Sequence, residues 1–260
     1  MKPKVVITLV DGMRPDAVES LNDSFLLELR NKSKWSFESQ TVLPAVTLPS
    51  HISLFTGVTP EVHQIKDNLF KPYQSPLPSL FELARKAGKK TAAIFTWEEL
   101  RDINRPGGLD RLDFRCLPED TDEARMKFEE TFTDEAIALI ATQEYDLIFY
   151  YFELADVVGH RDGWMSPAYL QAIACADRCL KRIFDALPPD YHMIVTADHG
   201  GHELDHGSAP EDRRIPIWFY GSSFTPGESP EGFSLLDIAP TALTLLGETP
   251  PAHWQGVSRV

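Results

Sequence analysis

The sequence predicts one α/β domain with a mostly parallel central sheet and helices on both faces. Two patterns lead to this fold class. Continuous apolar runs rich in β-branched residues, which are typical of strands buried on both faces, alternate with longer stretches whose apolar residues follow helical spacing. The 260 residues suit one such domain, and no Gly/Ser-rich linker divides them, so we treat residues 1–260 as a single domain.

The predicted strands follow the first pattern. The run Val5–Val10 ends at Asp11-Gly12, which places Asp11 at the carboxyl end of its strand. Open α/β sheets bind their ligands at that edge. Similar strands are predicted at Thr91–Thr96, Asp146–Phe152 and His192–Thr196.

Helices are predicted between and after these strands, at residues 77–86, 134–141, 167–187 and 235–246. Residues 99–121 form instead an irregular stretch that is rich in Arg and Asp and contains Pro106, Gly107 and Gly108. This irregular pattern predicts a long loop or a small irregular insert. Loops of that length are often functional lids.

Charge and composition exclude several classes of protein. The 39 acidic and 25 basic residues give a formal net charge of −14, whereas nucleic-acid polymers are bound by clustered Lys and Arg. No apolar run approaches the roughly 20 residues of a membrane span, and Asp11 interrupts the first run before a secretory signal could form. We therefore expect a cytoplasmic protein that has no membrane span and acts on a small molecule rather than a nucleic-acid polymer. Its oligomeric state stays unknown.

The three cysteines are odd in number and contain no CxxC pair, which suits a reducing compartment. Cys175 and Cys179 are four residues apart on a predicted helix. They could face a metal ion, but we interpret them as core residues.

Four clusters of chemically active residues recur at predicted strand ends. They contain five of the eight histidines and three aspartates, and carboxylate with imidazole is a ligand set for zinc, manganese or iron. Each cluster alone also fits a turn, a helix cap or a loop histidine. The clusters are Asp11-Gly12; Thr47-Leu48-Pro49-Ser50-His51 with Asn68; Asp156-Val157-Val158-Gly159-His160; and Asp198-His199-Gly200-Gly201-His202 with His206.

Thr47 is a candidate nucleophile. Pro49 favours a first helical turn, so Thr47 would lie at the positive end of a helix running through residues 51–55. A threonine hydroxyl is almost wholly protonated at neutral pH, and a bound divalent cation would stabilise its alkoxide. The alternative is that Thr47 only caps the helix.

Together these motifs resemble the alkaline phosphatase superfamily, and within it they are most similar to the type I phosphodiesterase and nucleotide pyrophosphatase branch. The resemblance spans nearly the whole chain. It is carried by residues 6–12, Thr47–His51 with Thr56-Gly57 and Pro60–His63, Asp156 with Gly159-His160, Asp198-His199-Gly200, and residues 237–241. It implies an alkaline phosphatase-like fold and hydrolysis of phosphate esters with two divalent metal ions, zinc first and manganese as the alternative.

The resemblance also implies a role for each matching residue. Thr47 would attack phosphorus and form a phosphothreonine intermediate, and Asn68 would bind a phosphoryl oxygen. The last metal ligand would be His206, with His202 as the alternative. The metal ligands would be Asp11, Thr47, Asp198 and His199 for one ion, and Asp156, His160 and His206 for the other.

Two histidines of the motifs are interpreted as structural. His63 is expected to brace its loop, because Gln64 stands where the family usually has glycine. His51 is expected to fix the loop of the nucleophile. Sulfatase activity is disfavoured, because Thr47 and His51 replace the Cys or Ser and the Arg of the sulfatase motif.

Asn68, in place of an arginine, favours a diester substrate, since a monoester dianion needs additional positive charge. The alternatives are a phosphomonoesterase, a phosphonate hydrolase or a catalytically silent metal-binding protein. A phosphomutase would need a large inserted domain, for which the roughly 60 residues between Thr96 and Asp156 are too few. Candidate arginines for a monoester site are Arg101, Arg105, Arg111 and Arg115 of the insert.

Overall fold

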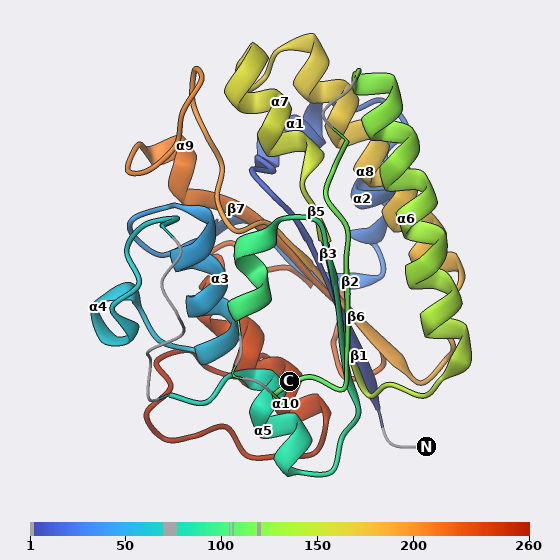
Figure 1. Cartoon of the computed structure of the whole chain (residues 1–260), viewed down its shortest axis with the longest axis vertical. Helices are drawn as coiled ribbons and strands as arrows, with labels where there is room; N and C mark the ends of the chain where they lie inside the picture. The colour runs from blue at the N-terminus through green and yellow to red at the C-terminus, as the bar shows by residue number, and fades with distance from the viewer. Residues whose placement is uncertain (1–2, 70–76, 104, 106, 119–120) are drawn as a thin grey trace.

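A computed structural model describes residues 3–69, 77–103, 105, 107–118 and 121–260. In these residues one eight-stranded sheet runs through the molecule between two layers of helices (Figure 1). The strands are β1 (Lys4–Val10), β2 (Ser33–Gln40), β3 (Thr91–Phe95), β4 (Arg111–Phe114), β5 (Leu147–Phe152), β6 (Tyr191–Thr196), β7 (Arg214–Tyr220) and β8 (Gly227–Glu228).

Helices cover both faces of this sheet. In Figure 1, α2, α6 and α8 lie on one side, and α3, α5 and α10 lie on the other. The helices are α1 (Pro15–Ser20), α2 (Phe25–Leu29), α3 (Thr47–Thr56), α4 (Pro60–His63), α5 (Leu80–Lys86), α6 (Asp122–Thr142), α7 (Leu154–Asp162), α8 (Pro167–Asp185), α9 (Pro210–Arg213) and α10 (Ile238–Leu245), with the short 3₁₀ helices η1 (Glu98–Asp102) and η2 (Leu235–Asp237).

The centre of the sheet is parallel, which confirms the predicted fold class. The strand order is β4-β3-β5-β1-β6-β7-β2-β8, and β1 lies between β5 and β6 with both neighbours parallel to it. Every residue of β3, β5 and β6 is buried, because helices cover both faces. Parallel strands bring the residues that follow them to one edge of the sheet.

The antiparallel part of the sheet was not predicted. β7 pairs antiparallel with both β6 and β2. Serines and a glutamate interrupt the apolar pattern of β2, and β7 contains Pro216, which disfavours a central strand. The structure accommodates Pro216 where the β2–β7 register shifts between Ser36 and Ser39.

The insert is more ordered than expected. It contributes η1 and the edge strand β4, which pairs parallel with β3; residues 104, 106, 119 and 120 of the insert lie outside the described residues. Helix α6 begins at Asp122, twelve residues before the predicted start at 134. Its first turns are rich in charged residues, so the apolar spacing that indicates a helix is weak there.

The helix α8 has a strongly apolar face that packs on the core. Cys175 and Cys179 are buried on this helix, as predicted, and Cys175 lies against the Met126 carbonyl of α6. Within the described part of the chain, no helix combines the length and the apolar character needed to cross a bilayer.

The C-terminal segment packs against the end of α3. Gly57 ends this helix with a φ of +63°, and its carbonyl accepts a hydrogen bond from the Gln255 backbone at 2.7 Å. A Cβ added at Gly57 would lie 2.7 Å from Cγ of Trp254. The position therefore requires glycine for its backbone conformation and for this close contact.

We expect Gly57→Ala to lower the free energy of unfolding by about 2–4 kcal/mol, through backbone strain and overpacking. Gly88→Ala is the matched control, because its φ is +76° and no atom lies within 4 Å of the added Cβ. The control should cost only about 1 kcal/mol. Urea unfolding measures both, and equal losses would show that the Trp254 contact adds nothing.

Candidate active site

The loops that follow β1, β5 and β6 converge at one edge of the sheet. Asp11 follows β1 directly, Asp156 lies in α7 after β5, and Asp198 and His199 follow β6. Because β5, β1 and β6 are adjacent and parallel, their carboxyl ends meet at this edge. Thr47, the first residue of α3, completes the group.

The first cluster surrounds the Nε2 atom of His199. This nitrogen lies 3.2 Å from Oγ1 of Thr47 and 3.2 Å from Oδ1 of Asp11. It lies 3.3 Å from Oδ2 of Asp198. Ligand atoms around a tetrahedral zinc ion with bonds of about 2.0 Å are about 3.3 Å apart, so these separations fit a bound metal ion.

A second cluster shares His199 and lies on the α7 side. Ligand atoms of Asp156, His199 and His206 are all within 4.8 Å of one another. Nε2 of His206 is 3.8 Å from Oδ1 of Asp156, and Nε2 of His160 is 3.6 Å from Oδ2 of Asp156. His160 lies beside this group, one helical turn after Asp156. The ring of His160 is more exposed than the ring of His206.

Three carboxylate oxygens of these clusters are buried without a hydrogen-bond partner among the described residues, namely Oδ1 of Asp11, Oδ1 of Asp156 and Oδ2 of Asp198. Burial, together with the negative charges of Asp198 and Asp156, raises the pKa of the Asp11 carboxyl well above its usual range. Burial also raises the pKa values of Asp156 and Asp198. A divalent cation would satisfy these oxygens, so the residues present fit metal ions at both clusters.

The buried imidazoles are suited to the same role. Burial lowers the pKa of His199 and of His206, which keeps both rings neutral near pH 7. Nδ1 of His199 contacts the Gly200 carbonyl at 2.7 Å, and Nδ1 of His206 contacts the Ala45 carbonyl at 2.8 Å. These carbonyls accept the Nδ1 protons and leave each Nε2 lone pair directed at the cluster.

The structure brings His206 into the ligand cluster and leaves His202 outside it. Nδ1 of His202 lies 2.7 Å from Oδ1 of the buried Asp212, and this contact raises the pKa of His202. The other oxygen of Asp212 accepts the backbone N–H groups of Gly207 and Ala209. Asp212 therefore shapes the loop that carries both histidines, a role that no local sequence pattern indicates.

Thr47 lies at a helix start that its own N-cap residue does not cap. The residue before it is Val46, and no side chain caps α3 locally. Oδ1 of Asn68 instead accepts the N–H of Leu48 at 2.9 Å. Because the amide oxygen is engaged, the donor end of Asn68 is the end that can contact a further acceptor near Thr47.

The two histidines interpreted as structural lie behind Thr47, the candidate nucleophile. Nδ1 of His51 donates to the Thr47 carbonyl at 2.8 Å, and the ring is fully buried. Nε2 of His63 contacts the Ser53 hydroxyl at 2.9 Å, while its Nδ1 accepts the N–H of Ile65. Burial lowers the pKa of His63 to about 4, so this histidine is a neutral brace of α3 and its following loop.

Several aromatic side chains hold the Asp11-Gly12 turn. The Tyr151 hydroxyl donates to Oδ2 of Asp11. Tyr169 and Trp164 donate to the Gly12 carbonyl at 2.8 Å and 3.0 Å. Sequence reasoning missed these contacts, because the tyrosines and the tryptophan look like ordinary core residues in their segments.

Glu129 of α6 was also missed. Its Oε1 accepts the N–H of Leu154 at 3.0 Å, at the start of α7, where Glu153 provides no side-chain cap. The helix α7 carries Asp156 and His160, so Glu129 positions both. Burial raises the pKa of Glu129 to about 8, and the folded protein therefore keeps this carboxyl protonated at neutral pH.

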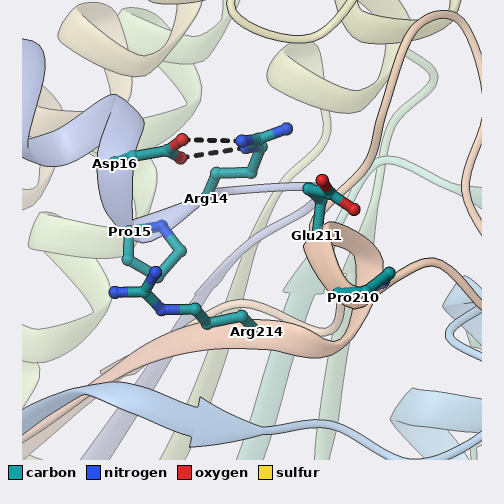
Figure 2. A pocket seen from close by; sticks show the side chains of 6 residues that line it. All are labelled: Arg14, Pro15, Asp16, Pro210, Glu211 and Arg214. Carbon is teal, nitrogen blue, oxygen red and sulfur yellow. Dashed lines mark hydrogen bonds and ion pairs between the residues drawn. The ribbon is translucent and has the colours of Figure 1, made fainter.

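A cavity of about 210 Å³ lies between the start of α1 and the helix α9 (Figure 2). Arg14 pairs there with Asp16 and also donates to the Gly201 carbonyl at 2.8 Å. None of the candidate metal ligands lines the cavity. Its lining residues are Arg14, Pro15, Asp16, Pro210, Glu211 and Arg214. We therefore interpret Arg14 as a support for the loop that follows His199.

Comparison with known proteins gives a consistent family and fold. The family profile described as type I phosphodiesterase / nucleotide pyrophosphatase matches residues 5–213. Murine ectonucleotide pyrophosphatase / phosphodiesterase 5, solved as an inactive variant with AMP, superposes with a TM-score of 0.81 at 15% identity over 96% of both chains. A putative sulfatase from Bacteroides thetaiotaomicron gives a TM-score of 0.80 at 16% identity, covering all of this chain and 74% of the other.

The curated relatives include phosphoglycerate mutases. The 2,3-bisphosphoglycerate-independent phosphoglycerate mutase of Legionella pneumophila (strain Lens) is 35% identical over 134 residues, which are 48% of this chain and 25% of the mutase. The corresponding enzyme of Shewanella baltica is 35% identical over 132 residues. The chain thus spans about a quarter of the length of the mutases that it matches.

Glu129 predicts a distinctive pH dependence of stability. Its usual pKa is 4.5 and its folded value is about 8, so the folded state retains a proton that the unfolded state releases. Stability is therefore lost as pH rises between these values. Between about pH 5.5 and about pH 8.5, the wild type should lose about 3 kcal/mol more than Glu129→Gln, as urea unfolding would measure. Parallel curves for the two proteins would show that Glu129 is ionised in the folded state.

Proposed function

The chain belongs to the type I phosphodiesterase / nucleotide pyrophosphatase family, and on this premise we propose that it is a metal-dependent hydrolase of phosphate diesters. The observation that carries the proposal is the position of the Thr47 hydroxyl. It lies 3.2 Å from Nε2 of His199, within a buried group of carboxylates and imidazoles at the start of α3. A hydroxyl in this environment can lose its proton to become a nucleophile.

The proposed metal ligands are those of the two clusters. Asp11, Thr47, Asp198 and His199 would hold one divalent ion, zinc or manganese; Asp156, His206 and His160 would hold the other. When bound, two such ions supply positive charge that stabilises the threonine alkoxide and the charge developing on the phosphoryl and leaving oxygens. His199 lies between the two groups and would orient both.

The side chains divide the remaining work. Oγ1 of Thr47 gives up its proton and attacks phosphorus in line; the bond to one substituent breaks, that group leaves as the protonated alcohol, and the phosphothreonine ester keeps the second substituent. The amide donors of Asn68 bind a non-bridging phosphoryl oxygen. Water then attacks phosphorus, the bond to Oγ1 of Thr47 breaks, and the hydroxyl is restored on reprotonation. His51, bonded to the Thr47 carbonyl, keeps the nucleophile in place throughout.

Three of the four candidate arginines of the insert form ion pairs that support a diester rather than a monoester. Arg111 pairs with Asp113 at 2.8 Å, and Arg115 pairs with Glu135 at 2.8 Å. Arg105 lies 3.4 Å from Glu82. These guanidinium groups are therefore engaged by carboxylates outside the candidate site. A monoester dianion would need such a charge beside its third free oxygen.

A second candidate function is transfer or hydrolysis of a phosphate monoester. The 35% identity to phosphoglycerate mutases favours it, because those relatives are named for chemistry on a phosphorylated glycerate. The two candidates differ in the substrate charge that they accept, so a direct comparison of model substrates separates them.

We expect zinc- or manganese-loaded protein to hydrolyse bis-p-nitrophenyl phosphate faster than p-nitrophenyl phosphate. Thr47→Ala should lower kcat by about a thousandfold or more, because it removes the nucleophile. Thr47→Ser retains a hydroxyl and should keep part of the activity. A Thr47→Ala protein with normal kcat would refute the mechanism, and a preference for the monoester would favour the second candidate.

The two loop histidines provide a matched test of metal binding. We expect His206→Ala to weaken binding of one metal ion by about tenfold or more, because it removes a ligand. His202→Ala should change metal content little, since His202 pairs with Asp212 outside the clusters. Metal titration followed by elemental analysis measures both. The reverse pattern would assign the ligand role to His202.

A further inference from the structure

Three buried oxygens beside the second cluster have no hydrogen-bond partner in the described part of the chain. They are Oγ1 of Thr96, Oε2 of Glu99 and Oε2 of Glu153. Thr96 is only 4% exposed to solvent. Buried polar atoms are normally paired, so three unpaired acceptors in one region need an explanation.

The fold brings these three residues together. Thr96 directly follows β3 and Glu153 directly follows β5, and the two strands are adjacent and parallel. Glu99 lies in η1, which begins two residues after Thr96. The parallel register of β3 and β5 therefore places Thr96 beside the start of the segment that follows β5, and Glu99 is three residues further along the chain from Thr96.

The region carries excess negative charge. Burial is the main cause that raises the pKa of Glu153 to about 6, and the charges of Asp156 and Glu99 add to it. The positive charge of Arg125 opposes this shift. Its Nε donates to the Pro118 carbonyl at 3.0 Å, and its Nη1 contacts Oδ1 of Asp122 at 3.3 Å. Arg125 therefore does not pair with the free oxygens of Glu99 or Glu153.

A metal ion is a poor match for this group. Among the described residues, the groups of three or more potential metal ligands are the two of the active site, and neither includes Glu99 or Glu153. What the group offers is three oxygen acceptors, two of them on carboxylates. A primary ammonium presents three N–H donors and one positive charge, which complements this set.

We infer that Thr96, Glu99 and Glu153 form a subsite for a primary ammonium group on the second substituent of a phosphodiester substrate. Glu153 lies one helical turn before Asp156, so the subsite adjoins the proposed position of the phosphoryl group. The substrate class is then an aminoalkyl phosphodiester. This inference rests on the proposed diester hydrolysis.

The direct test compares two series of p-nitrophenyl phosphodiesters. In one series the second substituent is an ω-aminoalkyl chain of about two to four carbons, and in the other a methyl group replaces the ammonium. For at least one chain length, we expect kcat/KM of metal-loaded protein to be about tenfold or more higher for the amino ester, because charge-assisted hydrogen bonds are strong. A ratio near one at every length would overturn the inference.

Variants locate the effect. Glu153→Gln and Glu99→Gln should each bring the ratio of the two kcat/KM values toward one. Glu98→Gln is the matched control, because Glu98 lies in the same 3₁₀ helix with its side chain exposed, and it should keep the wild-type ratio. A ratio that is unchanged in both Glu153→Gln and Glu99→Gln would place the ammonium elsewhere and overturn the assignment.

A binding measurement separates this inference from the proposed function. Calorimetric titration of metal-loaded protein with 3-aminopropylphosphonate and butylphosphonate requires no turnover. Tighter binding of the amino compound, lost in Glu153→Gln, supports the subsite even if no diester is hydrolysed. Equal binding overturns it. Hydrolysis of bis-p-nitrophenyl phosphate, which carries no ammonium, reports on the proposed function alone.

Discussion

The candidate site is built around three carboxylates that are buried close together, an arrangement that is unfavourable without a compensating positive charge. Asp11, Asp156 and Asp198 follow three adjacent strands, and each has an oxygen that no donor among the described residues satisfies. Mutual repulsion and burial favour protonation of such a group unless a cation joins it. The same arrangement that would weaken an ordinary protein core would therefore become favourable with a bound cation.

The surrounding residues satisfy the oxygens that face away from the clusters. Tyr151 donates to Asp11, and the Gly12 backbone donates to Oδ1 of Asp198 at 3.2 Å. Glu129 fixes the start of α7, and Asp212 fixes the loop of His206. These contacts leave one side of each ligand open toward the same small volume. The geometry of the candidate site is thus determined as much by the hydrogen bonds behind these carboxylates and imidazoles as by the side chains themselves.

Sequence reasoning predicted the parallel strands and the strand-end residues, because burial on both faces leaves continuous apolar runs. It failed for β2 and β7, where serines and Pro216 break the pattern. It also missed Tyr151 and Glu129. Their roles depend on which strand or helix packs opposite them, and no spacing within one segment encodes that relation. The preference for His206 over His202 as a ligand came from family resemblance and stays a prediction; in the structure His202 contacts Asp212 outside the two clusters.

The packing of Trp164 limits how the site could change during evolution. A Cβ at Gly159 would lie 2.7 Å from this indole, and one at Gly201 would lie 2.1 Å from it. The ring thus joins the loops after β5 and β6, so enlarging either glycine requires a smaller residue at 164, which would leave a void between two ligand-bearing loops. Such compensating changes must occur together and are therefore rare. New substrate preferences are expected to arise instead through substitutions that leave this indole and both glycines in place.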